Sequence, residues 1–317
     1  METKIIKGDR AKERIFAEVR TETARLQAVY GEVPGIAFIG FPCTPLMKYN
    51  VPLHVHTAET MGFRVYTEIL ANESTESEVF AAIDALNARP GLDAIVLLQP
   101  LPEHLNPVRI INRIDPAREV EGFHPQNLMK TMIPDIDADR FPMCLPEALY
   151  EMLGEEGVRI TGDQEWVFLL DDGFVKNTLV RMIVRAAASR VVPAGSAVTF
   201  VNWDGGDAET HGRRADVLVV VTKNPESLCP QWVKPGCCVI DIYSNLVKEV
   251  PSKADPSKLV PVIRGGVKTE EMTGIAGSLL PIPGGLMTVV MAILFRNTVL
   301  SFRKRIQVES TEKTTVL

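Results

Sequence analysis

Two kinds of hydrophobic pattern alternate along the chain. Short apolar runs, such as residues 93–98, are typical of strands buried on both faces of a parallel sheet. Between them lie charged stretches with apolar residues at helical spacing, such as residues 8–29. Because strands alternate with helices, the pattern predicts an α/β fold with parallel sheets. Strands are expected at 35–41, 63–69, 93–98, 166–170, 197–201, 217–221 and 238–242, and helices at 8–29, 46–61, 75–87, 147–153, 175–188 and 286–305.

The chain has 317 residues, a length typical of about two domains. Residues 126–146 have weak periodicity, several Asp and three Pro, which predicts a connection. We expect the domains at residues 1–145 and 146–285, with a helix over residues 286–306 returning to the first. The polar segment 307–317 is expected to be a disordered tail.

Composition and charge exclude some classes of function. A net charge of −6 argues against nucleic-acid binding, which normally needs a basic face. The apolar stretch 279–295 is broken by Pro281 and Pro283, so no membrane span is expected. The N-terminus has no signal-peptide pattern, and the odd number of cysteines lacks the spacing of a disulfide framework. We therefore expect a cytoplasmic protein with reduced thiols and no metal site.

Several short strings occur in a characteristic order. They are Pro-Gly-Ile-Ala at 34–37, Gln-Pro-Leu-Pro at 99–102, Glu-Val-Glu-Gly-Phe-His-Pro-Gln-Asn at 119–127, Val-Ile-Asp at 239–241 and Pro-Ile-Pro-Gly-Gly at 281–285. As an ordered set they resemble the bifunctional methylenetetrahydrofolate dehydrogenase/cyclohydrolase family over residues 3–305. The resemblance implies two α/β domains with a cleft between them, the second a Rossmann-like parallel sheet. It also implies that tetrahydrofolate binds the first domain, that NAD(P) binds the second, and that the protein is a homodimer.

The folate site departs from the family pattern. The family's Tyr-x-x-x-Lys pair falls on Asn50 and His54, and its aspartate falls on Glu121. The neighbouring Tyr49 and Lys48 are alternative substitutes, but a one-residue offset turns a helical side chain by about 100°. The family's glutamine falls on Leu98, with Gln99 one position later.

We take Glu121 and His54 as the candidate catalytic residues. A carboxylate in a folate cleft can act as a general base, and a histidine with a pKa of about 6.5 can shuttle protons. The alternatives are a solvated loop carboxylate and a packed histidine. The candidate substrate-binding residues are Tyr49, Asn50, Leu98, Gln99, Pro100, Leu101, Pro283, Gly284 and Gly285. Residues 283–285 could instead form only a tight turn before a buried helix.

The nucleotide loop departs further. The glycine-rich loop of the family falls on residues 170–178, where Leu170 would block close approach and Asp171 and Asp172 would repel a pyrophosphate. Gly173 alone remains of its glycines, and the two aspartates could simply cap a helix. Three other cofactor strings are replaced, at residues 202–203, 222–225 and 285–288. These departures predict that NAD(P) binding is lost.

Together, the departures favour a folate enzyme without redox chemistry. The preferred hypothesis is transfer of the methylene unit of 5,10-methylenetetrahydrofolate to an amine-bearing small molecule. One alternative is a working dehydrogenase/cyclohydrolase. The other is a catalytically inactive relative that binds folate or a partner.

Overall fold

The computed structural model describes residues 2–133 and 141–315, with side chains up to residue 308. Its contacts divide the chain into two compact units. The three-stranded unit comprises Lys12–Glu147 and Val290–Leu317, and the six-stranded unit comprises Met1–Ala11 and Ala148–Val289. The residues up to Ala11 therefore group with the six-stranded unit, whereas the first domain was expected to begin at residue 1. The α/β fold predicted from the hydrophobic pattern is confirmed.

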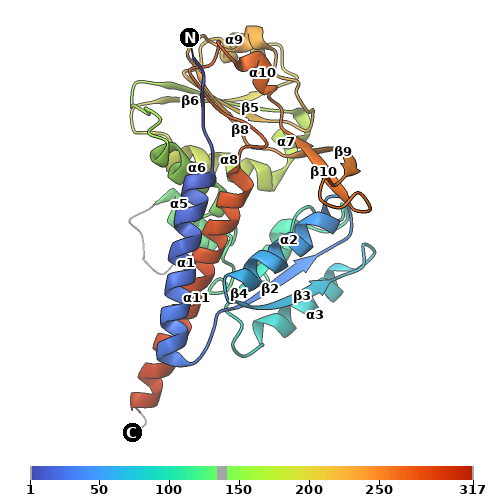
Figure 1. The fold of residues 1–317 in the computed structure, drawn as a ribbon, viewed down its shortest axis with the longest axis vertical. Coiled ribbons are helices and arrows are strands. Elements are labelled where there is room, and N and C mark those ends of the chain that lie inside the picture. Colours follow the sequence, from blue (N-terminus) through green and yellow to red (C-terminus); the bar gives the residue numbers. More distant parts are fainter. Residues whose placement is uncertain (1, 134–140, 316–317) are drawn as a thin grey trace. The chain divides into compact units, whose positions relative to one another are not determined.

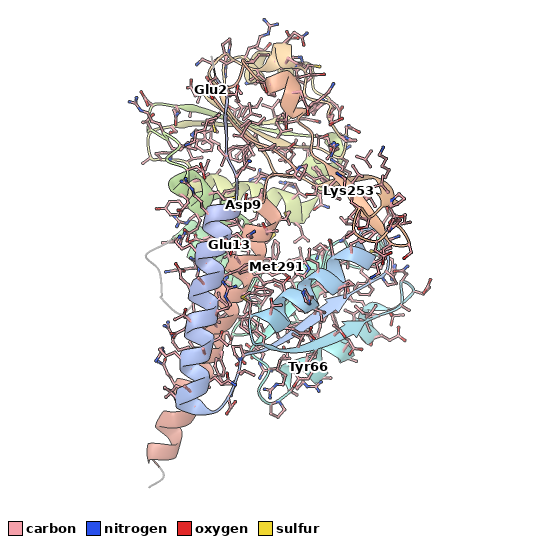
Figure 2. All side chains as sticks on the ribbon, viewed as in Figure 1. Glu2, Asp9, Glu13, Tyr66, Lys253 and Met291 are labelled. Atoms are coloured by element: carbon pink, nitrogen blue, oxygen red, sulfur yellow. The ribbon has the colours of Figure 1, made fainter. Side chains whose placement is uncertain are left out.

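The three-stranded unit is built on a parallel sheet of order β3-β2-β4. The chain leaves the central strand β2 through α2, forms β3, and returns through α3 to β4. Figure 1 shows α2 and α3 on opposite faces of this sheet. On β3, the Tyr66 ring (Figure 2) lies 3.9 Å from the Arg89 guanidinium carbon. The elements are β2 (Gly35–Gly40), α2 (Met47–Thr60), β3 (Arg64–Ile69), α3 (Glu76–Asn87) and β4 (Ala94–Leu97).

Two long helices, α1 (Asp9–Tyr30) and α11 (Leu286–Thr315), lie side by side (Figure 1). Phe295 of α11 stacks on Phe16 with a centroid distance of 6.2 Å. Helix α11 continues through most of the 307–317 segment that was expected to be disordered, which corrects that prediction. Its stretch Leu286–Val308 is apolar and long enough to cross a membrane. Two thirds of the most apolar window is buried in protein, as in the core helix of a globular domain.

Two shorter helices complete this unit, and a third begins in it but groups with the six-stranded unit from Ala148 on. One of the three corrects the sequence prediction. Helix α5 occupies part of the segment 126–146 that was expected to be a connection. It begins at Pro125 with His124 as its N-cap, because the His124 ring accepts a hydrogen bond from the Gln126 N–H. Residues 134–140 lie outside the described residues. The helices are α4 (Pro107–Ile111), α5 (Pro125–Met132) and α6 (Cys144–Glu155).

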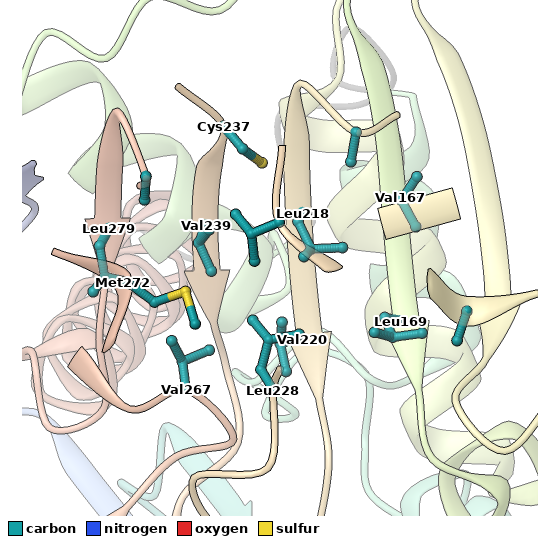
Figure 3. Packing of buried hydrophobic residues seen from close by; sticks show 14 of the residues in the cluster. Val167, Leu169, Leu218, Val220, Leu228, Cys237, Val239, Val267, Met272 and Leu279 are labelled. Atoms are coloured by element: carbon teal, nitrogen blue, oxygen red, sulfur yellow. The ribbon is translucent and has the colours of Figure 1, made fainter. Parts of the chain in front are cut away.

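The six-stranded unit is a parallel sheet of order β1-β11-β8-β7-β5-β6. Its central strands are apolar and buried on both faces, which is why they read as continuous hydrophobic runs. Figure 3 shows the core on one side, where Val167, Leu218, Val239 and Leu279 come from four adjacent strands. The strands are β1 (Lys4–Ile5), β5 (Glu165–Leu170), β6 (Ala197–Asn202), β7 (Val217–Val221), β8 (Cys238–Asp241) and β11 (Ser278–Leu280).

The predicted helix at 175–188 is two helices, because Asn177 ends one and caps the next. An antiparallel hairpin that the sequence did not indicate follows β8, with Lys253 (Figure 2) in its turn. The remaining elements are α7 (Asp172–Lys176), α8 (Thr178–Val191), α9 (Ala208–Gly212), a 3₁₀ turn (Pro230–Trp232), β9 (Asn245–Pro251), β10 (Leu259–Arg264) and α10 (Thr269–Met272).

Candidate functional site

In the three-stranded unit, the predicted site residues gather where β2 and β4 end. The chain after β2 crosses to β3 on one side, whereas the chain after β4 returns to Glu119 on the other side, beside β4. In parallel α/β sheets, ligands bind at the carboxyl ends of the strands at such a point. Three segments meet there: helix α2 after β2, residues 98–101 after β4, and residues 119–121, which run beside β4 through an Ile95–Glu119 bridge.

Glu121 is a half-buried carboxyl at this edge. It accepts a hydrogen bond from the backbone N–H of Leu97, the last residue of β4. Burial, together with the nearby Glu119 carboxylate, raises the pKa of Glu121 to about 8. The following Gly122 has a φ of +84°, and a Cβ there would lie 2.4 Å from Met143 Cα. The glycine therefore lets residues 119–121 turn against the start of α6.

His54 lies on α2, with its ring edge-on to Phe38 of β2 at a centroid distance of 5.6 Å. Its Nδ1 is 2.7 Å from the Asn50 carbonyl oxygen. Because a carbonyl only accepts hydrogen bonds, Nδ1 carries the proton and Nε2 keeps a lone pair. Burial lowers the pKa of His54, so the ring is neutral near pH 7. The geometry thus gives His54 the form of a base.

His54 and Glu121 are anchored at neighbouring positions of the sheet. His54 packs on Phe38 of β2, and Glu121 is bonded to Leu97 of β4. Leu97 is the register partner of Ile39, the residue after Phe38. The two candidate catalytic residues therefore contact adjacent strands, β2 and β4.

The other predicted binding residues of this unit differ in exposure. Leu98 is in the core, with 6% of its surface exposed, whereas Gln99 and Leu101 are half-buried and Pro100 is exposed. On α2, Tyr49 and Asn50 are half-buried, and the exposed Lys48 has its Nζ 5.0 Å from the Tyr49 ring centroid. Ligand contact by these residues stays a prediction.

The structure adds an apolar cavity of about 570 Å³ that the sequence did not predict. It lies between the loop after β2, the start of α2 and the end of β3, and Lys48 is its one charged lining residue. The lining residues are Phe41, Pro42, Cys43, Thr44, Pro45, Met47, Lys48, Val51, Pro52 and Ile69. Cys43 Sγ also donates to the Pro100 carbonyl at 3.1 Å, which ties the loops after β2 and β4 together.

The six-stranded unit has a second crossover point of this kind, between β5 and β7. Asp171 follows β5, but its carboxylate is buried and already bonded. It accepts the N–H groups of Phe174 at 2.9 Å and of Lys223, after β7, at 2.6 Å. Asp172 forms an ion pair with Lys176 at 2.5 Å. The predicted helix-capping alternative for Asp171 is confirmed.

Leu170, Asp171 and Asp172 were expected to exclude a nucleotide from this loop, but in the structure each of them has partners within the protein. Leu170 is 3% exposed and packs in the core, so its side chain does not cover the loop. Asp171 accepts two backbone N–H groups and Asp172 is paired with Lys176, so both carboxylates are engaged by the protein's own donors. Gly173 has ordinary space around it, and the exposed Lys223 adds a cation at this edge. In parallel α/β sheets, dinucleotides bind at a crossover point of this kind.

Residues 281–285 belong to the six-stranded unit and are packed against the chain itself. The Gly284 carbonyl accepts the Gly8 N–H at 2.9 Å. A Cβ on Gly284 would lie 2.1 Å from the Pro281 oxygen, and Gly285 has a φ of +95°. This packing accounts for both glycines, while a ligand contact by Pro283, Gly284 or Gly285 stays a prediction.

Comparison with known proteins agrees with this arrangement. Residues 6–121 match the family model of the tetrahydrofolate dehydrogenase/cyclohydrolase catalytic domain, and residues 143–306 match that of its NAD(P)-binding domain. The chain belongs to this family. It is 33% identical to the bifunctional protein FolD of Desulfosudis oleivorans over 96% of this chain and 98% of that one. The FolD of Desulfatibacillum aliphaticivorans is 35% identical, over 96% and 98%.

Solved structures of the family have the same fold. The methylenetetrahydrofolate dehydrogenase-cyclohydrolase of Trypanosoma brucei, complexed with NADP cofactor and inhibitor, is 25% identical with a TM-score of 0.80. It is matched over 96% of this chain and 99% of that chain. The FolD of Campylobacter jejuni is 23% identical with a TM-score of 0.78, over 96% and 99%, and supports the fold alone.

The comparisons correct one prediction and leave another without support. The prediction that NAD(P) binding is lost is wrong, because the second half of the chain matches the family's NAD(P)-binding domain and a relative is complexed with NADP. The preferred hypothesis of a transferase without redox chemistry gains no support, since the relatives are dehydrogenases and cyclohydrolases. The chain is an enzyme of folate one-carbon chemistry, which matches the stated alternative better.

Sequence reasoning missed one functional candidate, Glu119. It is 2% exposed and lies two residues before Glu121. The signal was present as two acidic residues flanking Val120 within an otherwise apolar turn. Only the structure shows that Glu119 points into the protein.

Proposed function

We propose that this protein oxidises 5,10-methylenetetrahydrofolate with NAD(P)⁺ and hydrolyses the resulting methenyl group to 10-formyltetrahydrofolate. The observation that carries this proposal is the match to both domains of the family along nearly the whole chain. The candidate residues at the carboxyl edge of the three-stranded sheet support it, because they include a neutral base and a proton-bearing acid.

In the oxidation step, bound NAD(P)⁺ supplies the hydride acceptor. The loops after β5 and β7 would hold it. Asp171 fixes them to each other through its bond to the Lys223 N–H. Thr222, which is buried after β7, keeps the same turn in place through its hydroxyl, which accepts the Asn224 N–H at 3.0 Å. These bonds pre-organise the edge before any ligand arrives.

In the hydrolysis step, water adds to the electrophilic methenyl carbon and the bond from that carbon to N5 breaks. His54 Nε2 takes one proton from the attacking water, which suits a neutral ring whose Nδ1–H is held by Asn50. Glu121 returns a proton to N5 as the carbon–nitrogen bond breaks. The second proton of the water goes to solvent as the formyl carbonyl forms. The products are 10-formyltetrahydrofolate and one net proton.

The test uses purified protein with 5,10-methylenetetrahydrofolate and either NAD⁺ or NADP⁺. Reduced nicotinamide is followed by absorbance and 10-formyltetrahydrofolate by mass spectrometry. Glu121→Gln and His54→Gln are each expected to lower the rate of methenyl hydrolysis by about 10²–10⁴-fold. His56→Gln is the matched control, because His56 is exposed on the same helix and should leave the rate unchanged.

Two results would count against the proposal. Tetrahydrofolate release with an amine acceptor and no cofactor reduction would favour the transferase. Folate binding without any turnover, unchanged by Glu121→Gln, would favour an inactive relative.

A further inference from the structure

Glu119 is a fixed acceptor at the base of the candidate site. Its Oε1 accepts the Glu121 N–H at 3.1 Å. Its Oε2 accepts the His124 N–H at 2.9 Å and the Asn127 Nδ2–H at 3.2 Å. The side chain is almost completely buried. One carboxylate thus fastens the backbone on both sides of Gly122 and the start of α5.

The two carboxyl groups differ in the donors they meet. Burial raises the pKa of Glu119, whereas the several N–H groups that face its carboxylate favour the charged form. Among the described residues, the N–H that faces the Glu121 carboxyl is that of Leu97, and the Glu119 charge disfavours ionisation of Glu121. Two neighbouring carboxyl groups do not both ionise readily, so the one that accepts more N–H groups, Glu119, takes the charge and Glu121 keeps the proton.

Other titratable groups nearby do not reverse this assignment. Cys144 of α6 has a pKa raised well above its usual value by burial, so it is a neutral thiol. Arg296 of α11 is paired with Glu147 of α6 at 3.2 Å. The His124 ring accepts the Gln126 N–H through Nδ1. Among the described residues, Glu119 is the charge that acts on the Glu121 carboxyl.

We propose that Glu119 is a positioning residue: ionised and buried, it holds Glu121 as a proton-bearing acid, ready to protonate folate N5. This proposal rests on the proposed function for the step in which the proton is used. The division of the proton between the two carboxyl groups stands on their contacts alone. Glu119 touches no reacting atom and acts through Glu121.

The direct test is a ¹³C NMR titration of glutamate side-chain carboxyls in the intact protein, with Glu121→Gln to assign the signal. Glu121 is expected to titrate near pH 8 in the wild type. In Glu119→Gln, which keeps the side-chain length and one acceptor oxygen, it should titrate lower by about one pH unit or more, a tenfold change. Glu119→Asp keeps the charge and should stay near the wild-type value.

The kinetic readout is the pH profile of methenyl hydrolysis, corrected for the spontaneous reaction. Since the step needs protonated Glu121, kcat/KM should fall as pH rises through about 8, and this fall should move to lower pH in Glu119→Gln. A Glu121 carboxyl that titrates near 4.5 in the wild type overturns the inference. So does an unmoved profile in a folded Glu119→Gln protein. If the wild type shows no turnover, the proposed function is wrong, but the NMR titration still shows which of the two carboxyl groups carries the proton.

Discussion

Replacing Gly122 by alanine tests whether the turn that carries Glu121 needs a glycine. The backbone there has a φ of +84°, which costs an alanine about 1–2 kcal/mol. The new Cβ would lie 2.4 Å from Met143 Cα and 2.5 Å from Met143 N. Ordinary carbon contacts are about 3.5–4.0 Å, so the backbone must open by about 1 Å, at a further cost of about 1–3 kcal/mol. We expect Gly122→Ala to destabilise the three-stranded unit by about 2–5 kcal/mol.

Gly31→Ala is the matched control in the same unit. Gly31 has a φ of +74°, but a Cβ there would meet nothing within 4 Å. Its expected cost is only the backbone term of about 1–2 kcal/mol. The entropy that alanine removes from the unfolded chain is the same for both variants and cancels in the comparison.

Urea unfolding followed by circular dichroism and by tryptophan fluorescence gives the measurement. The three tryptophans, Trp166, Trp203 and Trp232, all lie in the six-stranded unit, so fluorescence reports that unit separately. Gly122→Ala should shift the transition seen by circular dichroism more than the fluorescence transition. Equal losses for Gly122→Ala and Gly31→Ala would refute the packing argument.

Three other expected outcomes follow from buried charges. Arg305→Met removes the ion pair between Arg305 Nε and Asp93 Oδ1, which are 2.7 Å apart, and should lower the free energy of unfolding in urea by about 3–5 kcal/mol because Asp93 is buried. Arg113→Met, which breaks the exposed pair with Asp84, should lower it by less than about 1 kcal/mol. Asp171→Ala should lower stability by about 1–2 kcal/mol and weaken NADP⁺ binding measured by calorimetry, with Asp172→Ala as the control. Tighter NADP⁺ binding by Asp171→Ala would mean that the Asp171 charge opposes the nucleotide. The pKa of Glu121 is about 8 in the folded state against 4.5 in the unfolded chain, so the folded state binds more protons between these pH values. The contribution of Glu121 to the free energy of unfolding is therefore greatest below pH 4.5, falls as the pH rises and levels off above pH 8. Equal slopes of unfolding free energy against pH for the wild type and Glu121→Gln would contradict this.

Much of the fold could be predicted from local pattern. The apolar run at 217–221 is strand β7, and the helix at 75–87 is α3, whose N-cap Thr75 forms a capping box with Glu78. Helix α5 was not predicted because it is stabilised by contacts with residues outside the helix rather than by a regular hydrophobic pattern within it. The Asn127 side chain, for example, donates to the Pro116 and Glu119 carbonyl oxygens.

The candidate site was predicted less completely, because partners distant in sequence decide what a charge does. Asp171 and Asp172 indicated repulsion of a phosphate, yet Asp171 is bonded to the Lys223 N–H, 52 positions away. Glu121 could be found from its motif. Its proton could not, since that depends on the buried Glu119 and on the Leu97 N–H at the end of β4. A sequence gives the side chains of a site but not the donors that face them.

Deuterium tracing can follow dehydrogenase and cyclohydrolase activity of this chain in a single experiment. The protein is incubated with tetrahydrofolate carrying a fully deuterated 5,10-methylene bridge and with NADP⁺ or NAD⁺, and the products are analysed by mass spectrometry. If both activities are present, one deuterium is expected on the reduced nicotinamide and one on the formyl group of 10-formyltetrahydrofolate. A product that keeps both deuteriums, with no reduced nicotinamide formed, would contradict the proposed function.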